Sequence, residues 1–404
     1  MTPSEEFENL ISNKDNAILS NFIYSWGGTS NNPSVDLDYA KFFLQSPEYL
    51  SEKFEDNEDT WKEDIYYNID WNNTSNAGIE PSILTVFIIS LFLSTLKDII
   101  HDGLKKDYVV RTENLKAKVK GRILHGYNIR KNIIPGRPDR FFCSFQEYTD
   151  DIPVNRLLKT ALIISRDIID SQEKSSAIFK DNELTSTVEQ CLANMQTVSR
   201  EPYPSFAVNK LVVPHGKLFR HYEKAVSLAK TIIKLEDAYF ISERDDGKTM
   251  FPNFWIYLPT VFEHYVYGKM NTDSFETDEI LIQQEGVFKQ RADFIFLNPP
   301  MVVDAKYKWW YKDIPKDRQG DFRNDFRELA GYARDSKYFK EPAIAVQCVI
   351  VYPAFESADN TNQISELPEK VIQCFPSNRF TPIKPISELN GFYKVGVYMP
   401  RKVK

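Results

Sequence analysis

The chain has 404 residues, of which 42% are hydrophobic and 14% aromatic, a composition that predicts a globular protein with two or three domains. Its net charge of −7 excludes a uniformly basic coat for nucleic acid. Four widely separated cysteines, with no C-x-x-C pair, exclude a disulfide scaffold and indicate reduced, buried thiols in a cytoplasmic protein.

Residues 1–80 are predicted to form a separate acidic region. Residues 1–74 hold 15 Asp and Glu against 4 Lys and Arg, a net charge of −11. Such a surface repels DNA and suits a protein partner, although a run of charge is most often a solvated face. Acidic residues at positions 5, 6 and 8 also argue against a signal peptide. We therefore expect 1–80 to be a protein-interaction domain.

Residues 81–245 are predicted to form a mixed middle region with a mainly helical core. The uncharged stretch 81–96 is too short, and too rich in Ser and Thr, for a membrane span. We expect a buried helix there, over about 83–102 and ended by Gly103, and no membrane association. Short strands and turns are expected in 108–145, where glycine and proline recur. Helices are expected over about 153–170, 182–197 and 216–238.

The stretch 105–140 within this region is strongly basic, with 11 Lys and Arg against 3 Asp and Glu. Four of its cations stand at every second position: Lys116, Lys118, Lys120 and Arg122. If the run forms one strand, alternation places all four side chains on one side, where they would track the phosphates of DNA. The alternative is that this face pairs with the acidic region 1–80 or with an acidic protein partner.

The third region, 246–404, follows a charged, glycine-containing boundary near 240–250. A helix is expected over about 259–270, a hairpin over 291–308, a helix over 322–334, and strands over 343–352 and 392–399. This order predicts an α/β (α+β) fold in which helices flank a mixed central sheet.

The segment 291–306 is the most informative part of the chain. It consists of two apolar runs joined by an Asn-Pro-Pro turn. In a symmetric hairpin Asp293 lies opposite Asp304, and Lys306 shares a face with Asp304. Adjacent carboxylates repel unless a cation lies between them, and hard oxygen ligands favour Mg²⁺. A surface salt bridge is the commoner explanation of Asp-x-Lys, but the unbroken apolar runs indicate buried strands, where charged groups are costly and often functional.

Several stretches carry a family resemblance: 103–108 with 120–123, 137–140 running into 146–159, 261–266 with 304–308, and 325–333. The Asp…Asp-x-Lys pattern resembles the PD-(D/E)xK nuclease superfamily. Together, over roughly residues 85–400, the stretches resemble the McrC family, the nuclease subunit of McrBC-type modification-dependent restriction systems. In two places the chain departs from that family. Glu328 stands where a glutamine usually precedes Tyr332 by four residues, and Ala292 replaces the proline before the first aspartate.

The resemblance implies a PD-(D/E)xK domain in 246–404 and a DNA endonuclease that uses Mg²⁺ or Mn²⁺. It also implies a hetero-oligomer with an AAA+ GTPase or ATPase, and modified or phage DNA as the substrate. The chain contains no G-x-x-x-x-G-K-[ST], so such a motor would be a separate protein. Two alternatives remain: a stand-alone repair or recombination nuclease, and a catalytically silent adaptor that regulates an AAA+ motor.

In this scheme Asp293 and Asp304 bind the metal, and Lys306 orients or deprotonates the attacking water. Glu263, on the preceding helix, either completes the metal shell or is an ordinary solvent-facing glutamate. Lys308 is a candidate phosphate contact. For the remaining residues we expect packing or other structural roles: Glu328, Tyr332, His264, Trp309, Trp310 and Tyr311.

Overall fold

The computed structural model describes residues 22–24, 37–46, 67–76, 81–172, 182–200, 220–242, 250–287, 289–340, 345–355, 367–386 and 389–401. The chain divides into two compact units, Met1–Phe87 with Lys248–Lys404, and Ile88–Gly247. This division differs from the three regions expected from the sequence. The predicted acidic region 1–80 lies mostly outside the described residues, and its described parts belong to the same unit as the C-terminal region.

Strand pairing explains this grouping. Two N-terminal strands, β1 (Phe22–Tyr24) and β2 (Tyr67–Asn76), flank β6 (Met250–Tyr257) in a three-stranded sheet. The β1–β6 pair is parallel and the β2–β6 pair is antiparallel. The short helix α2 (Tyr39–Leu44) also contributes to this unit, because Phe42 packs edge-on against Tyr265 of the C-terminal region at 5.3 Å between ring centroids.

A mixed six-stranded sheet forms the centre of the C-terminal region. Its strand order is β11-β12-β10-β9-β8-β7. The strands are β7 (Ile280–Glu285), β8 (Arg291–Leu297), β9 (Pro300–Ala305), β10 (Gln347–Ala354), β11 (Lys384–Pro385) and β12 (Phe392–Tyr398). The β7–β8, β8–β9 and β11–β12 pairs are antiparallel, whereas β9–β10 and β10–β12 are parallel. The mixed sheet expected from the sequence is therefore present.

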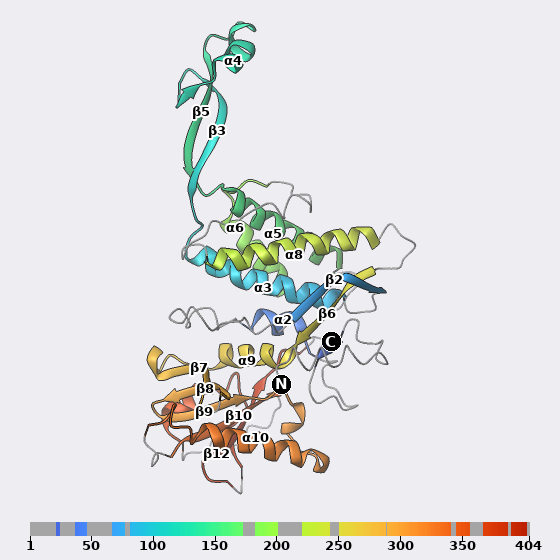
Figure 1. Cartoon of the computed structure of the whole chain (residues 1–404), viewed down its shortest axis with the longest axis vertical. Helices are drawn as coiled ribbons and strands as arrows, with labels where there is room; N and C mark the ends of the chain where they lie inside the picture. The colour runs from blue at the N-terminus through green and yellow to red at the C-terminus, as the bar shows by residue number, and fades with distance from the viewer. Residues whose placement is uncertain are drawn as a thin grey trace. The chain divides into compact units, whose positions relative to one another are not determined.

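Helices cover both faces of this sheet. Helix α9 (Leu258–Lys269) and helix α10 (Gln319–Tyr332) lie on opposite sides of it (Figure 1), and the short α11 (Glu369–Cys374) belongs to the same unit. Phe326, Leu329 and Tyr332 of α10 pack with inward side chains of β8, β9 and β10 in one apolar cluster. Strands β8, β9 and β10 are buried along almost their whole length, which is why their sequences are apolar at successive positions.

The second unit, Ile88–Gly247, contains most of the expected helices. These are α5 (Pro153–Gln172), α6 (Asn182–Asn194), α8 (Arg220–Ser242) and most of α3 (Pro81–His101), which begins in the other unit. Among the described residues one helix is apolar enough to cross a membrane, over Leu84–His101, and 72% of it is buried inside the protein. This burial agrees with the core helix predicted there. Gly103 follows α3 with a φ of +86°, in the left-handed region that favours glycine.

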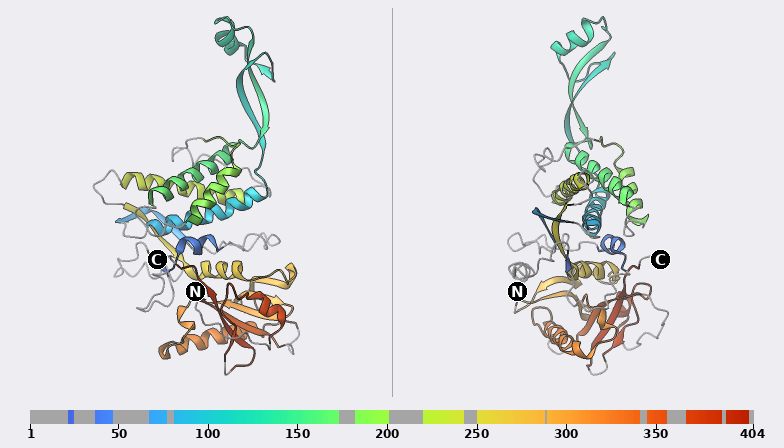
Figure 2. Two further views of the ribbon diagram at one scale, coloured as in Figure 1. Left: turned by 180° about the vertical axis from the view of Figure 1, so that it is seen from behind. Right: turned by 90° about the vertical axis from the view of Figure 1, so that its right-hand side faces the viewer.

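A two-stranded arm projects from the helices of this unit (Figures 1 and 2). It consists of β3 (Asp107–Lys116) and β5 (Arg140–Thr149), paired antiparallel along their whole length. The tip between them carries β4 (Arg122–Ile123), α4 (His125–Asn128) and a π-helical turn, Ile129–Ile133. The sequence predicted strands and turns in 108–145, but the observed strands β3 and β5 are longer than the short strands expected there.

The four alternating cations of the basic stretch do not share one strand, contrary to our expectation. Lys116 is the last residue of β3, Lys118 and Lys120 follow it in irregular backbone, and Arg122 begins β4. The strand ends because Ala117 and Gly121 adopt positive φ angles of 55° and 67°. A Cβ at Gly121 would lie 2.5 Å from the carbonyl oxygen of Ser144, so only glycine allows the chain to pass so close to β5.

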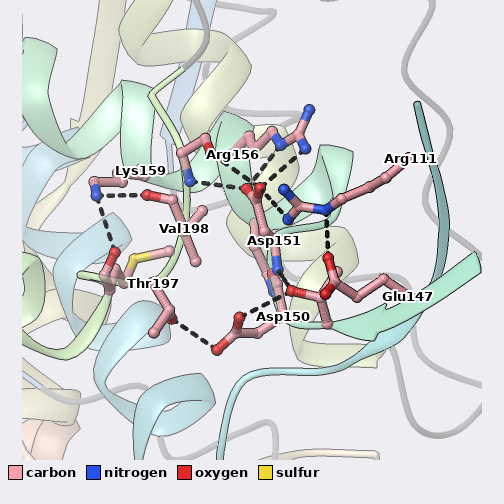
Figure 3. A network of polar contacts seen from close by, with 12 residues as sticks. Arg111, Glu147, Asp150, Asp151, Arg156, Lys159, Thr197 and Val198 are labelled. Atoms are coloured by element: carbon pink, nitrogen blue, oxygen red, sulfur yellow. Dashed lines mark hydrogen bonds and ion pairs between the residues drawn. The ribbon is translucent and has the colours of Figure 1, made fainter. Parts of the chain in front are cut away.

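A buried carboxylate, Asp151, joins the base of the arm to the helices of the same unit (Figure 3). Arg156 on α5 donates to both of its oxygens, at 2.8 and 3.1 Å, and Arg111 on β3 donates at 3.1 Å. The backbone N–H and the hydroxyl of Ser199 also donate to it. Burial alone would raise the pKa of Asp151, but the bonds from Arg156 and Ser199 hold it at about 2. Asp151 therefore connects β3, α5 and the segment after α6.

Candidate active site at the end of the β8–β9 hairpin

The hairpin has the register expected from the sequence. Phe294 pairs with Val303 and Leu297 with Pro300, so the next pair in the same register is Asp293 and Asp304. Both aspartates are buried, with 9% and 3% of their surface exposed. The backbone N–H of Ala305 donates to Asp293 Oδ2 at 2.7 Å, which fixes that carboxylate against the end of β9.

Burial disfavours the ionisation of both carboxylates. Burial raises the pKa of Asp293 well above its usual value, and the negative charges of Glu263 and Asp304 raise it further. Burial also raises the pKa of Asp304, although the ammonium of Lys306 opposes this shift. A buried pair of this kind is stabilised by a shared proton or by a cation.

Lys306 supplies positive charge at this point. Its Nζ lies 3.0 Å from Asp304 Oδ2 and 3.0 Å from Glu328 Oε2 on α10. Its backbone N–H donates to Val351 O of β10 at 2.8 Å, so the sheet fixes the position of its main chain. Burial by itself would lower the pKa of Lys306, but the charges of Asp304 and Glu328 hold it well above the usual value. The side chain is therefore an ammonium ion between two carboxylates.

Glu328 and Tyr332 belong to the contacts of the site, whereas the sequence predicted packing or other structural roles for them. Glu328 contacts Lys306, and the hydroxyl of Tyr332 donates to Glu328 Oε1 at 2.9 Å. Burial would raise the pKa of Glu328, but Lys306 and this hydrogen bond lower it. The four-residue spacing and the departure from the family glutamine were the sequence signals that pointed to this pair.

Gln283 on β7 is a site residue that sequence analysis missed. Its Nε2 donates to Glu263 Oε2 at 2.8 Å and to Asp293 Oδ1 at 3.3 Å, so one amide bridges the two acids. Glu263 therefore faces the pair from α9, but with Gln283 between it and Asp293. Among the described residues no three His, Cys, Asp or Glu side chains gather closely enough to hold a metal ion by themselves.

The residues present nevertheless fit a hard divalent cation. Two buried carboxylates stand side by side on neighbouring strands, and carboxylate oxygens are the ligands that Mg²⁺ prefers. Asp304 Oδ2 is buried and accepts no well-directed hydrogen bond in the described structure, although it forms the ion pair with Lys306. The ammonium of Lys306 already lies against this oxygen, so a metal bound there would share the oxygen with Lys306 or displace the ammonium.

Lys308 occupies a different environment from the phosphate contact we expected. Its Nζ lies 2.8 and 2.6 Å from the two oxygens of Asp325 on α10, a carboxylate that is only 7% exposed. Tyr311, fully buried as expected for a core aromatic, donates its hydroxyl to the same carboxylate. Because a buried carboxylate requires a cation, Lys308 is part of the packing below the site. His264 is likewise buried, on α9.

The basic residues of the arm belong to the other unit, Ile88–Gly247. Of these, Lys120 lies 3.7 Å from Glu147 and 4.0 Å from the ring centre of Phe145, both on β5. Lys116, Lys118 and Arg122 have exposed side chains.

Comparison with known proteins supplies a family. The family model described as "McrBC 5-methylcytosine restriction system component" matches residues 67–353. No curated protein sequence matches the chain. A Thermococcus gammatolerans structure of McrB AAA+ hexamers with bound McrC shares 16% identity, covering 78% of this chain and 62% of that one, with a TM-score of 0.32. The cryo-EM structure of the McrBC complex from the same organism shares 14% identity, covering 46% and 47%, with a TM-score of 0.29. The match covers less than two thirds of the length of either of these two solved chains.

Proposed function

This chain belongs to the family of McrBC 5-methylcytosine restriction system components, and from that membership we propose that it is the DNA endonuclease subunit of such a system. It would hydrolyse phosphodiester bonds of modified or phage DNA in the cytoplasm, with a separate AAA+ GTPase or ATPase as its partner. The observation that carries the proposal is the buried pair Asp293 and Asp304, with the partly buried Lys306 beside it, at the end of a mixed sheet. The same set supports a PD-(D/E)xK domain.

Asp293 and Asp304 would hold Mg²⁺ or Mn²⁺, together with a backbone carbonyl near Ala305. When bound, the metal would polarise the scissile phosphate and lower the pKa of a coordinated water. Asp293 is already oriented for this role by the N–H of Ala305. Glu263 would approach the site from α9 once Gln283 releases it.

Lys306 would orient the attacking water and stabilise the negative charge that develops on the phosphate. Its ammonium is held by Glu328, which in turn accepts the hydroxyl of Tyr332. A lysine held between fixed partners loses little freedom when the substrate arrives, and such preorganisation favours catalysis. Glu328 therefore acts through Lys306 and not on the substrate.

The arm offers a surface for the AAA+ partner. Its tip presents large apolar side chains to solvent, which soluble proteins usually reserve for interactions: Tyr127, Ile129, Ile133 and Ile134 are 54%, 46%, 60% and 73% exposed. The buried Asn132 holds this tip in place by donating to Asn114 and Asn128, at 2.9 and 2.7 Å. The similar McrC chain of Thermococcus gammatolerans is bound to McrB AAA+ hexamers.

The first experiment tests the proposed function itself. The chain is purified together with the products of its neighbouring genes, and cleavage of modified and unmodified duplex DNA is measured with Mg²⁺ and either GTP or ATP. We expect cleavage only when partner and nucleotide are both present. Robust cleavage by the chain alone would favour the stand-alone nuclease. An effect on the NTPase rate of the partner, with no cleavage, would favour the adaptor.

Charge reversal on the arm decides between its two possible ligands. If Lys118 and Lys120 contact phosphates, Lys118→Glu with Lys120→Glu should weaken DNA binding regardless of sequence and lower the salt dependence by about two units of slope. Fluorescence anisotropy of labelled duplex at several salt concentrations measures both effects. Ile134→Ser on the same tip is the matched control, since it should affect only the partner. Unchanged DNA binding with lost partner binding in the charge-reversed variant would make the stretch a protein interface.

A further inference from the structure

Gln283 stands in an irregular part of strand β7. Its neighbours Ile282 and Gln284 pair with β8 in regular register, which leaves Gln283 opposite Asp293. The backbone of Gln283 has a φ of +48°, in the left-handed region that is costly for a side chain of this size. Such departures from regular geometry often lie at functional sites, where they direct a side chain to a particular place. The strand therefore carries a backbone cost at the position whose side chain enters the candidate site.

The side-chain amide of Gln283 connects two acids from different elements. Its Nε2 donates to Glu263 Oε2 on α9 at 2.8 Å and to Asp293 Oδ1 on β8 at 3.3 Å. An amide nitrogen carries two N–H groups, so one can serve each carboxylate, whereas the amide oxygen would repel both. A neutral donor thus lies between two acids, where a cation shared by both carboxylates would also lie.

The two acids depend on this amide to different degrees. Asp293 is also oriented from its other side, because the N–H of Ala305 donates to its Oδ2 at 2.7 Å. The contact of Glu263 with the carboxylate pair runs through Gln283, and this agrees with the absence of a close group of three acids among the described residues. An N–H donor and a divalent cation compete for the same carboxylate oxygens, because both are attracted to them and repel each other.

We infer that Gln283 is a positioning residue that bridges Glu263 and Asp293 in the metal-free protein and turns away when both acids bind one divalent cation. The inference rests on the proposed nuclease function, whose metal it concerns. Because the bridge stabilises the metal-free state alone, it weakens metal binding. Glu263 then joins the metal site only after one amide has been released.

The test measures the binding of Mn²⁺ to the purified full chain, without DNA, by isothermal titration calorimetry. Gln283→Met keeps the length of the side chain and removes the amide. We expect it to bind Mn²⁺ about tenfold more tightly than the wild type, since hydrogen bonds to charged groups contribute at least this factor. Gln284→Met, the same change one residue along β7, is the matched control and should bind as the wild type does.

A second variant does not depend on how well methionine tolerates the backbone of this position. Gln283→Asn shortens the side chain by one methylene, so that its amide no longer spans both acids. Asparagine adopts positive φ angles more readily than glutamine, which favours folding of this variant. It should also bind Mn²⁺ more tightly than the wild type.

Thermal unfolding separates the inferred role from simple packing. Without metal, Gln283→Met should melt below the wild type, because two carboxylates have lost a donor. At saturating Mn²⁺ the two proteins should melt together, since the tighter binding of the variant offsets its lower stability. A residue that only packs would lower the melting temperature equally in both conditions.

A double-mutant cycle tests whether the effect passes through Glu263. Glu263→Gln removes the charge that the amide is inferred to hold away from the metal. In this background Gln283→Met should change the affinity for Mn²⁺ far less than it does in the wild type. An undiminished gain would mean that Gln283 acts independently of Glu263 and would overturn the inference.

The remaining outcomes separate this inference from the proposed function. Binding of Mn²⁺ to Gln283→Met and Gln283→Asn that equals or falls below that of the wild type, while the wild-type complex cleaves DNA, would overturn the bridge and leave the nuclease in place. Asp304→Ala reports the binding of Mn²⁺ to surface carboxylates. A wild type that binds no more Mn²⁺ than this variant would remove the metal site, and with it both proposals.

Discussion

Asp304→Ala, or Lys306→Ala, is expected to abolish DNA cleavage by the complex, with a loss on the order of 10³-fold or more. Asp304 is one of the two buried carboxylates proposed to bind the metal, and Lys306 is the ammonium beside it. Binding of the AAA+ partner should persist, because neither residue lies on the arm. The cleavage rate at saturating DNA and the co-purification of the partner measure these two properties. Equal cleavage by wild type and Asp304→Ala would rule out the nuclease assignment.

Thermal unfolding of Asp304→Ala provides a readout that does not depend on activity. Asp293 has a raised pKa in the folded protein, so its contribution to stability is complete at low pH and is lost as the pH rises through that folded pKa. Removing the facing carboxylate relieves part of this loss, and the melting temperature without metal should hold or rise slightly near pH 7. Mg²⁺ should raise the melting temperature of the wild type and not that of the variant. Asp317→Ala, an exposed carboxylate on the same unit, should behave as the wild type.

Asp151→Asn is expected to destabilise the unit Ile88–Gly247 by on the order of 3 kcal/mol. The isosteric change removes the charge that Arg111 and Arg156 share, and it leaves both guanidinium groups without their buried partner. Urea unfolding measures the free energy, and hydrogen exchange of the arm amides shows whether its base has loosened. The matched control is Asp150→Asn, which should cost far less, because among the described residues its carboxylate accepts from the hydroxyls of Thr149 and Thr197 and from no cation.

The same carboxylate predicts an acid transition. Its pKa falls from the ordinary value of 3.8 to about 2 on folding, so its contribution to stability is present above about pH 4 and is lost between pH 4 and 2. The shift corresponds to about 2 kcal/mol. Asp151→Asn should lack this part of the pH dependence. A wild type and variant whose stabilities fall in parallel from pH 4 to 2 would contradict the assignment of the lowered pKa to Asp151.

Short-range sequence patterns predicted the elements whose formation depends mainly on neighbouring residues. The helices and the two central strands followed from periodicity and capping, and the symmetric turn placed Asp293 opposite Asp304. The family resemblance drawn from short motifs is confirmed by the family model over residues 67–353.

Most of the missed features depend on contacts between distant segments. Strand β7 is short and only its first three residues are apolar, and the amide of Gln283 is significant only because α9 brings Glu263 to it. Glu328 meets Lys306 across 22 residues of sequence, a contact that helical spacing alone does not reveal. On the arm, two positive φ angles ended the strand that even spacing suggested. The pairing of β1 and β2 with β6 joins segments separated by more than 170 residues, beyond the reach of any local pattern.

The arm has a consequence for how members of this family could vary. Among the described strands, its two strands pair with each other and with the short β4 alone, so their length is independent of the helical body. Adding two residues to each strand would move the tip outward by about 7 Å while every side chain kept its face. Adding one residue to each would invert all the faces beyond the insertion. The length of the arm can therefore change in steps of two residues per strand, which fits the tip to a deeper or shallower binding site without changing which side chains face outward.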